Sequence, residues 1–162
     1  MLLNAAHSSE KPNKTPDVFP PSNWKYILKL LGLVIVADKR VLKEEVDTFL
    51  DVVSELRAVI DPTVYLTRQM ARDWFMLNKV ELLDVIDSLA YDTALCETLA
   101  PIKSLPHKLD VITGMVKIAV SGDDYSTVKR GLVKKTILYW NIRSEQHGTL
   151  EYSGAQKYIE NA

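Results

Sequence analysis

Apolar residues recur along the chain with the three-to-four-residue spacing of amphipathic helices. The first run ends at Asp38 and contains few polar residues, which predicts a helix buried on most sides. Its inward positions are Trp24, Ile27, Leu28, Leu31, Val34 and Ile35. A second run, after a short polar turn, places Val46, Phe49, Leu50, Val53 and Leu56 on one face. The pattern therefore predicts two helices joined by a turn around Lys39.

The middle of the chain continues the helical pattern, with interruptions at proline and asparagine. Asp61 and Pro62 end the second helix, and Pro62 suits the first turn of a new one. We expect helical segments over 65–75 and 80–89, with a joint at Asn78. A further helix is expected over 92–102, where Pro101 ends or kinks it.

Two more helices are expected in the last third of the chain. Pro106 opens the first, whose inward positions are Leu109, Ile112, Val116, Ala119 and Val120. Residues 121–124 form a tight turn before a helix that runs from about 126 to 142. The inner side of this last helix carries Val128, Leu132, Val133, Thr136, Ile137 and Trp140. No stretch shows the period-two alternation of a strand, so the predicted fold class is all-α.

The polar ends of the chain set the expected domain bounds. Residues 7–21 carry four prolines and few large apolar side chains, so they cannot bury enough surface to offset their ordering entropy. We therefore expect a flexible arm over 1–21 and a single-domain helical bundle over 22–145. An irregular tail, with a short helix over 155–159, is expected to complete the chain over 146–162.

The two ends of this domain match in plan. A hydrophobic helix, a turn and an amphipathic helix follow one another over 26–57 and again over 109–142. Setting Val41 on Tyr125 aligns the apolar positions on both sides of the turn. Each helical hairpin alone leaves an apolar face uncovered, so we expect the two to pack on each other with the middle helices at the sides. The alternative is a chance likeness of two amphipathic hairpins.

The first turn carries the segment Ala37-Asp38-Lys39-Arg40-Val41-Leu42-Lys43-Glu44-Glu45. This segment resembles the TerB-like tellurite-resistance family, whose local pattern is Ala-Asp-Gly, an apolar residue two positions on, and a Glu-rich helix start. The turn at 119–125 is similar to the family's second copy. The resemblance covers about 23–141 and implies an all-helical fold with pseudo-twofold symmetry. It also implies a link to tellurite or other chemical stress, association with a membrane complex, and no enzymatic activity.

The resemblance further implies an acidic cluster that holds a divalent cation. In the family, an Asp in each turn and a Glu about two helical turns later form this cluster. Calcium and magnesium prefer oxygen ligands, which carboxylates at converging helix ends supply. The candidate metal ligands in this chain are Asp38, Glu45, Asp123 and Asp124.

The second copy departs from the pattern at both matching positions. Gly122 stands where the first copy has Asp38, and Lys129 stands where it has Glu45. An ammonium group in place of a carboxylate opposes a cation, and Lys129 is then expected to pair with Glu45 and hold the two halves together by charge. Without a metal, Asp38 is an ordinary turn residue, and Glu45 lies in the first turn of a helix, where the exposed amides favour a carboxylate.

Composition and charge exclude several classes of function. Hydrophobic residues make up 47% and charged residues 25% of the chain, as in an ordinary globular protein. The net charge of -1 provides no general field that attracts nucleic acid. No apolar run is long enough to cross a membrane. The single cysteine, Cys96, is expected in the core, excludes an intrachain disulfide, and fits a cytoplasmic location.

The sequence contains no recognisable catalytic motif. The three histidines, His7, His107 and His147, are far apart and share no metal-ligand spacing. Zinc, phosphate-loop and dinucleotide-binding motifs are missing. We therefore expect a non-enzymatic module, with an enzyme whose site is assembled from distant residues as the remaining alternative.

Two places are candidate partner-binding surfaces. Trp74 and Phe75 cannot both point inward on one narrow helix face, so one of them is a candidate contact for a partner helix or for a second copy in a homodimer. Lys134 belongs to a basic cluster on the last long helix that suits an anionic partner. Core packing and a solvated helix face are the respective alternatives. The expected function is a TerB-like stress module that binds a divalent cation or a partner protein, or else a metal-free scaffold domain.

Overall fold

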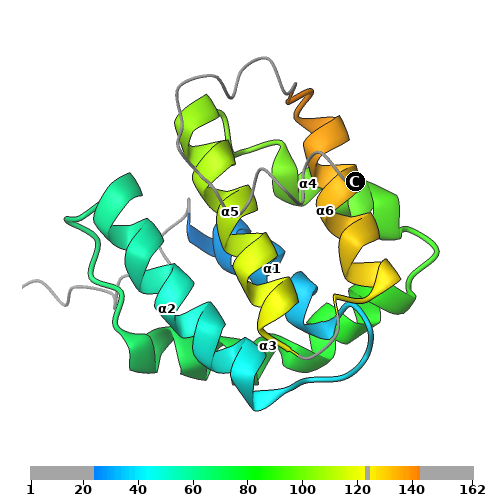
Figure 1. Cartoon of the computed structure of the whole chain (residues 1–162), viewed down its shortest axis with the longest axis horizontal. Helices are drawn as coiled ribbons and strands as arrows, with labels where there is room; N and C mark the ends of the chain where they lie inside the picture. The colour runs from blue at the N-terminus through cyan, green and yellow to red at the C-terminus, as the bar shows by residue number, and fades with distance from the viewer. Residues whose placement is uncertain (1–23, 123–124, 143–162) are drawn as a thin grey trace, which may run out of the picture.

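The computed structural model describes residues 24–122 and 125–142, and Figure 1 shows them as a bundle of helices. The helices are α1 (Trp24–Val36), α2 (Lys43–Ile60), α3 (Arg68–Asp87), α4 (Tyr91–Leu99), α5 (Leu105–Ser121) and α6 (Thr127–Tyr139). These residues contain no strand, which confirms the all-α prediction. None of the helices in these ranges is both long and apolar enough to cross a membrane. The predicted arm over 1–21 and tail over 146–162 lie outside the described residues.

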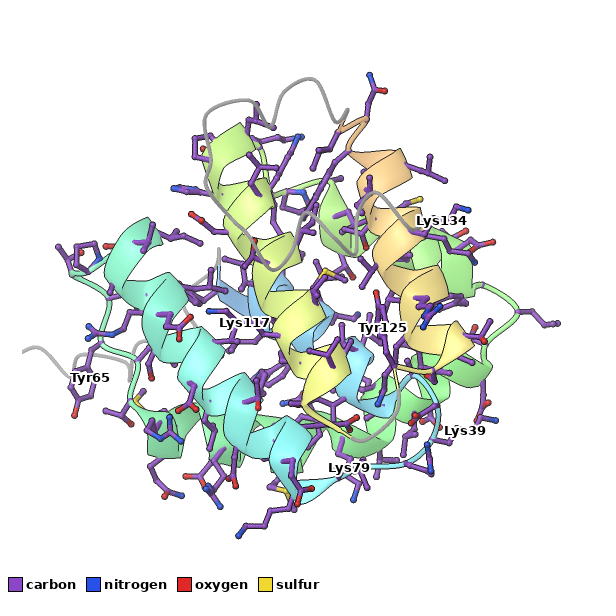
Figure 2. The ribbon with its side chains drawn as sticks, in the orientation of Figure 1. Lys39, Tyr65, Lys79, Lys117, Tyr125 and Lys134 are labelled. Carbon is purple, nitrogen blue, oxygen red and sulfur yellow. The ribbon has the colours of Figure 1, made fainter. Side chains whose placement is uncertain are left out.

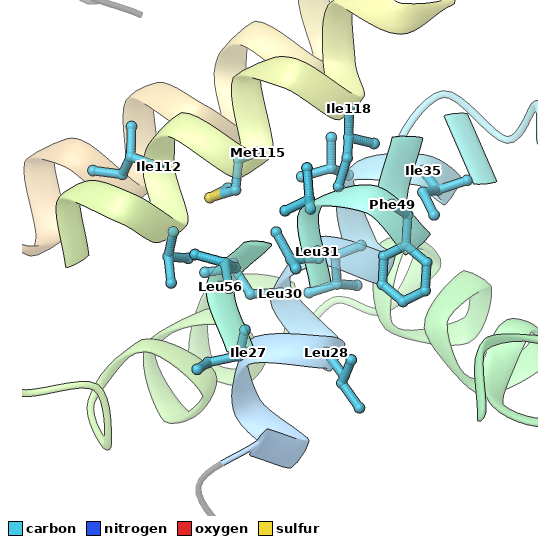
Figure 3. Close-up of a cluster of buried hydrophobic side chains, with 14 of the residues drawn as sticks. Ile27, Leu28, Leu30, Leu31, Ile35, Phe49, Leu56, Ile112, Met115 and Ile118 are labelled. Atoms are coloured by element: carbon cyan, nitrogen blue, oxygen red, sulfur yellow. The ribbon is translucent and has the colours of Figure 1, made fainter. Parts of the chain in front are cut away.

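Helix α1 lies at the centre of the bundle, as its almost continuous apolar sequence predicts. It packs against α2, α3, α4 and α5, so side chains on nearly every side of it are buried. Figure 3 shows Leu31 of α1 pointing into a cluster that also holds Leu56 of α2 and Met115 of α5. A helix that is apolar all round is stable only when other helices surround it, and this arrangement supplies them.

The first and second hairpins meet mainly through α5. Helix α5 packs along both α1 and α2, and the contact between α2 and α5 is the most extensive between any two helices. Gly114 lies at this contact, where an added Cβ would stand 2.5 Å from Val52 Cγ1. The glycine therefore lets the two helices approach closely. Helix α3 covers α1 and α2 on one side, while α4 contacts α1, α3 and α6.

Two predictions about the middle of the chain were wrong. Helix α3 runs without a joint through Asn78, because the Asn78 side-chain amide donates a hydrogen bond to the Trp74 carbonyl oxygen one turn earlier, at 2.8 Å. Pro62 does not open a helix: it lies in a turn that Asp61 holds by accepting hydrogen bonds from the Thr63 backbone and hydroxyl. Helix α3 begins later, where the Thr67 hydroxyl accepts a hydrogen bond from the Met70 N–H.

Two side chains predicted to point inward are exposed. Cys96 is exposed on the short helix α4, because Leu95 and Leu99 take the inward positions. Val128 is 53% exposed on α6, because the next residue, Lys129, takes the inward position instead.

Candidate functional site

The turn after α1 is built on Asp38. Its carboxylate accepts a hydrogen bond from the Arg40 N–H at 3.0 Å, the local contact by which aspartate stabilises turns. Lys39 has a φ of 64°, in the left-handed region that favours glycine, and its N–H donates to the Val36 carbonyl at 2.8 Å. The Lys39 ammonium pairs with Asp87 at the end of α3, at 2.5 Å. The turn therefore directs the Asp38 side chain inward while the charge of Lys39 lies outside.

Glu45 lies in the first turn of α2 and is completely buried. Its carboxylate accepts a hydrogen bond from the Leu42 N–H at 3.4 Å, which satisfies one of the amides that a helix start leaves unpaired. This contact agrees with the predicted place of Glu45 at a helix start. One weak hydrogen bond does not compensate for burying a full charge, so the carboxylate needs a cationic partner.

Lys129 supplies that partner from α6. Ser126 caps α6 by accepting a hydrogen bond from the Lys129 N–H at 3.3 Å. The Lys129 side chain is only 1% exposed; its Nζ donates to Glu45 Oε1 and lies 3.2 Å from Asp38 Oδ2. The predicted pairing of Lys129 with Glu45 is therefore confirmed. We refer to Asp38, Lys129 and Glu45 as the buried triad.

Gly122 brings the second turn against the first. An added Cβ at Gly122 would stand 2.9 Å from Glu45 Oε1 and 3.0 Å from Leu42 Cδ1. Any larger side chain would therefore push into the carboxylate that Lys129 contacts. The turns at Lys39 and Gly122 thus meet at one end of the bundle, where a glycine fits without displacing the side chains of Glu45 and Leu42.

The electrostatics of Asp38 follow from this arrangement. Burial by itself raises the pKa of Asp38, but the Arg40 N–H and the Lys129 ammonium favour the carboxylate more strongly, so the pKa lies below its ordinary value of 3.8. The triad carries two carboxylates and one ammonium, and the Arg40 guanidinium stands 3.6 Å from Asp38 at its outer edge. The buried charges of both signs are therefore paired.

The predicted metal ligands fall into two groups. Asp38 and Glu45 are brought together, but the Lys129 ammonium contacts both carboxylates. Asp123 and Asp124 lie outside the described residues, so a metal role for them stays a prediction. Within 24–122 and 125–142, no group of three or more His, Cys, Asp and Glu side chains is placed to share a metal ion.

The structure separates the two aromatic residues of the predicted partner surface. Phe75 is fully buried, with its ring centroid 5.7 Å from that of Phe49, so it is a core residue. Trp74 is half-buried and covers Gly32 of α1, where its Cζ3 lies 3.5 Å from the place of an added Cβ. Neither aromatic side chain is fully exposed on the outer surface of α3. The core alternative therefore accounts for Phe75.

Sequence reasoning missed the apolar residues that α3 does expose. Met76, Leu77 and Val80 are 60%, 85% and 68% exposed. The structure buries Ala71, Phe75 and Leu82, and this phase of α3 leaves Leu77 and Val80 outside, but the apolar pattern of the sequence also allowed other phases.

The other predicted surface residue, Lys134, is exposed on α6, and Figure 2 shows it extending from the outer side of that helix. A separate hollow of about 90 Å³ lies between α2 and α5, with Gly114 in its wall and Lys117 among its lining residues. It is smaller than the roughly 300–1,000 Å³ of typical ligand pockets. This hollow therefore offers little room for a small-molecule substrate.

Comparisons of the chain with protein-family models, curated proteins and solved structures gave no match. What the chain does must therefore be inferred from its own residues, chiefly the buried triad and the exposed faces of α3 and α6.

Proposed function

We propose that this chain is a non-enzymatic, TerB-like helical module that binds a partner protein and that uses an internal lysine in place of a divalent cation. The observation that carries the metal-free part is the position of Lys129 Nζ, which contacts Glu45 Oε1 and lies 3.2 Å from Asp38 Oδ2. The two carboxylates are the ligands that the family resemblance implies for a cation. In this chain a side chain that cannot diffuse away occupies their inward oxygens.

Charge and coordination both oppose a cation beside this lysine. A divalent ion bound to Asp38 and Glu45 would stand close to the Lys129 ammonium, and like charges at such separations repel strongly where water is excluded. Calcium takes six to eight oxygen ligands, and magnesium needs a near-octahedral set. The triad offers two carboxylates whose inner oxygens already accept contacts from lysine. The alternative of a metal-free interaction domain is therefore better supported than the cation-binding form.

Local geometry supports the TerB-like part of the proposal. The family pattern has glycine where this chain has Lys39, and the φ of 64° at Lys39 is one that glycine adopts without strain. The closeness of the turns at Lys39 and Gly122 also agrees with two related hairpins that meet at their turns. The proposed link to tellurite or other chemical stress rests on the same resemblance. It predicts that expressing the chain raises the tellurite concentration that a sensitive bacterial host survives, relative to the empty vector.

The exposed surface of α3 supports a role in binding a protein. Leu77 is 85% exposed and Val80 is 68% exposed, on a helix whose other outward positions are mainly polar. Single exposed apolar residues are common, but neighbouring ones surrounded by polar side chains are typical of contact surfaces. A helix face with a small apolar centre suits another helix as its partner.

Cation titration tests the metal-free part of the proposal. Thermal unfolding of the full chain is followed with EDTA, calcium chloride or magnesium chloride. A native-state site at 100 times its Kd would add about 2.7 kcal/mol, which corresponds to a rise of about 5 °C or more in the unfolding midpoint for a domain of this size. We expect no change in the midpoint. A rise with calcium or magnesium would contradict the proposal and support the cation-binding form.

The variant Lys129→Glu is the matched control for that titration. It places a third carboxylate beside Asp38 and Glu45, where mutual repulsion destabilises the fold unless a cation binds. We expect calcium or magnesium to raise the unfolding midpoint of this variant but not that of the wild-type chain. This contrast would show that the assay detects a cation at the triad when one binds there.

A further inference from the structure

The outer side of α3 combines an apolar centre with acidic neighbours. Met76, Leu77 and Val80 are all at least 60% exposed. Around them, Asp73, Glu81 and Asp84 are exposed on the same side of the helix, as the helical spacing requires. Glu81 and Asp84 form no ion pair within residues 24–122 and 125–142, whereas Asp73 accepts a hydrogen bond from Gln69. We call these six residues, from Asp73 to Asp84, the α3 acidic face.

The outer side of α6 has the opposite charge. Arg130 and Lys134 are exposed one helical turn apart, and Leu138, one turn further on, is 68% exposed. Lys134 has no ion pair in the part of the chain that the structure describes, while Arg130 lies over the Tyr125 ring. We call Arg130, Gly131, Lys134 and Leu138 the α6 basic face.

Gly131 lies at the centre of the α6 basic face without an internal reason to be glycine. Among the residues that the structure describes, an added Cβ there would meet no atom within 4 Å, so no packing in this part of the bundle requires its small size. Glycine in the middle of a helix is less favourable than alanine. An open notch on a helix surface does, however, let a large side chain of another helix approach closely. An exposed leucine such as Leu77 has the size and chemistry to fill it.

We propose that the α6 basic face of one copy docks on the α3 acidic face of a second copy, with Leu77 seated over Gly131. This inference rests on the proposed function and names the partner as the chain itself. The charges are complementary: Glu81 and Asp84 meet Arg130 and Lys134, while Leu77 and Val80 cover the apolar groups between them. In each helix the paired charges are three or four residues apart, about 4.5–6 Å along the axis, so both pairs form together.

A two-fold contact between two α3 helices is less favourable. An antiparallel pairing about Leu77 places Asp73 of each copy opposite Glu81 of the other, and like charges set against each other destabilise a contact. Within a single chain the α3 and α6 faces are exposed, and the main packing partners of α3 are α1, α2 and α4 while those of α6 are α5 and α4. The docking is therefore between copies and head-to-tail, which produces rings or open chains.

Sedimentation of the full chain tests the docking first. The mass of one copy is 18.3 kDa. We expect the weight-average mass to rise above this value as concentration increases from about 10 µM to 1 mM, the range of a weak contact. We also expect added salt of about 0.5 M to lower the average mass, because exposed charge pairs are screened. A mass that stays at that of one copy over the whole range overturns the inference.

Charge reversal then identifies the two faces. One variant carries Glu81→Lys and Asp84→Lys, and the other carries Arg130→Glu and Lys134→Glu. Alone, each variant has two faces of the same sign, so we expect association to weaken about a hundredfold or more. An equimolar mixture has opposite faces again, and we expect its average mass to return to that of the wild-type chain. A mixture that does not associate overturns the head-to-tail docking.

Two further variants separate docking from net charge and from folding. Glu44→Lys with Glu97→Lys changes the net charge by as much as Glu81→Lys with Asp84→Lys, at exposed positions of α2 and α4 that belong to neither face, and should leave the association constant within about twofold. Gly131→Leu fills the notch, and because its Cβ meets no atom inside the bundle it should not lower the unfolding midpoint. We expect it to weaken association about tenfold, and unchanged association in this variant overturns the seating of Leu77.

The outcomes of these tests are distinct from those of cation titration. A chain that remains a single copy and shows no response to cations loses the docking described here but keeps the proposed metal-free module. A chain whose unfolding midpoint rises with calcium loses the proposed function, whatever its association.

Discussion

Among the described residues, two lysine–glutamate pairs join α2 to α5 and α6, and they differ sharply in burial. Lys117 of α5 reaches Glu55 of α2 at 2.7 Å, with side chains that are 50% and 58% exposed. Lys129 of α6 contacts Glu45 of α2, with side chains that are 1% and 0% exposed. Both are lysine–glutamate pairs between helices far apart in sequence, so they differ in burial and in the second carboxylate, Asp38, beside Lys129.

Burial changes what such a pair does for the fold. An exposed pair contributes about 0–1 kcal/mol, because water solvates both ions well when they separate. In a buried pair each ion has lost that water, so neither tolerates the loss of its partner. Lys117 and Glu55 can therefore rearrange at little cost. Lys129 and Glu45 fix the positions of the two turns, since any displacement would leave a charge unpaired in the core.

The largest expected effect is that of removing the buried lysine. Lys129→Met leaves Glu45 and Asp38 facing each other without a cation, and we expect the free energy of unfolding to fall by about 3–5 kcal/mol. The matched change Lys117→Met should lower it by less than about 1 kcal/mol. Urea denaturation of the two variants measures the difference. Equal losses would mean that burial does not distinguish the two pairs.

A double variant sharpens the comparison. In Lys129→Met/Glu45→Leu both buried ions of the pair are replaced by apolar groups, so the second change should recover about 0.5–3 kcal/mol of the stability lost in the first. The cycle of Lys117→Met with Glu55→Leu should give a coupling below about 1 kcal/mol. Strictly additive losses at the buried pair would be inconsistent with the contact that the structure places there.

Gly122, at the end of α5, and Gly131, within α6, should differ in the effect of an added methyl group on stability. Gly122→Ala would set a Cβ 2.9 Å from Glu45 Oε1, and the displacement should cost about 1–3 kcal/mol. Gly131→Ala meets no atom within 4 Å and should raise the free energy of unfolding by about 0.5–1 kcal/mol. Thermal or urea unfolding of both variants measures whether the free energy of unfolding falls for Gly122→Ala and rises for Gly131→Ala. A Gly122→Ala chain as stable as wild type would show that the turn accommodates an added methyl group.

Acid should modestly reduce the stability that the buried triad contributes, because Asp38 becomes protonated. The pKa of Asp38 lies below its ordinary value of 3.8, so its ionised form stabilises the fold above that pH, and the contribution is lost as the pH falls through the folded-state pKa. We expect Asp38→Asn to lower stability at neutral pH by about 1 kcal/mol. We also expect this variant to lose less stability than wild type on acidification.

Unfolding of both proteins by urea over a series of pH values measures this difference. The Lys117→Met chain is the control, and its acid dependence should follow that of wild type more closely. An Asp38→Asn chain with the full wild-type acid dependence would show that other carboxylates account for it.

The sequence predicted the fold and part of the site for a physical reason. The apolar spacing of α1 and α2 indicates which faces of these helices are buried. The two helices, their joining turn and the place of Glu45 could therefore be predicted. Alignment of the two turns placed Lys129 opposite Glu45, and that contact is confirmed. Predictions from local sequence patterns were wrong where contacts within the folded bundle determine the position of a side chain. Asn78 is satisfied within a continuous α3, and Cys96 is exposed because its neighbours fill the inward positions.

The exposed faces could not be predicted in the same way. The phase of α3 that exposes Leu77 and Val80 depends on which helices cover its other side, and the apolar pattern alone allowed more than one phase. Likewise, the empty space above Gly131 on α6 is a property of the packed bundle rather than of the α6 sequence.

Direct observation of the Lys129 ammonium by nuclear magnetic resonance tests the central claim. Exposed lysine ammonium protons exchange with water too fast to give sharp proton–nitrogen correlations at neutral pH and room temperature, whereas a buried, paired ammonium is protected. We predict one protected correlation that disappears in Lys129→Met and persists in Lys117→Met. A spectrum in which no protected signal depends on Lys129 would contradict the lysine-held pair of turns.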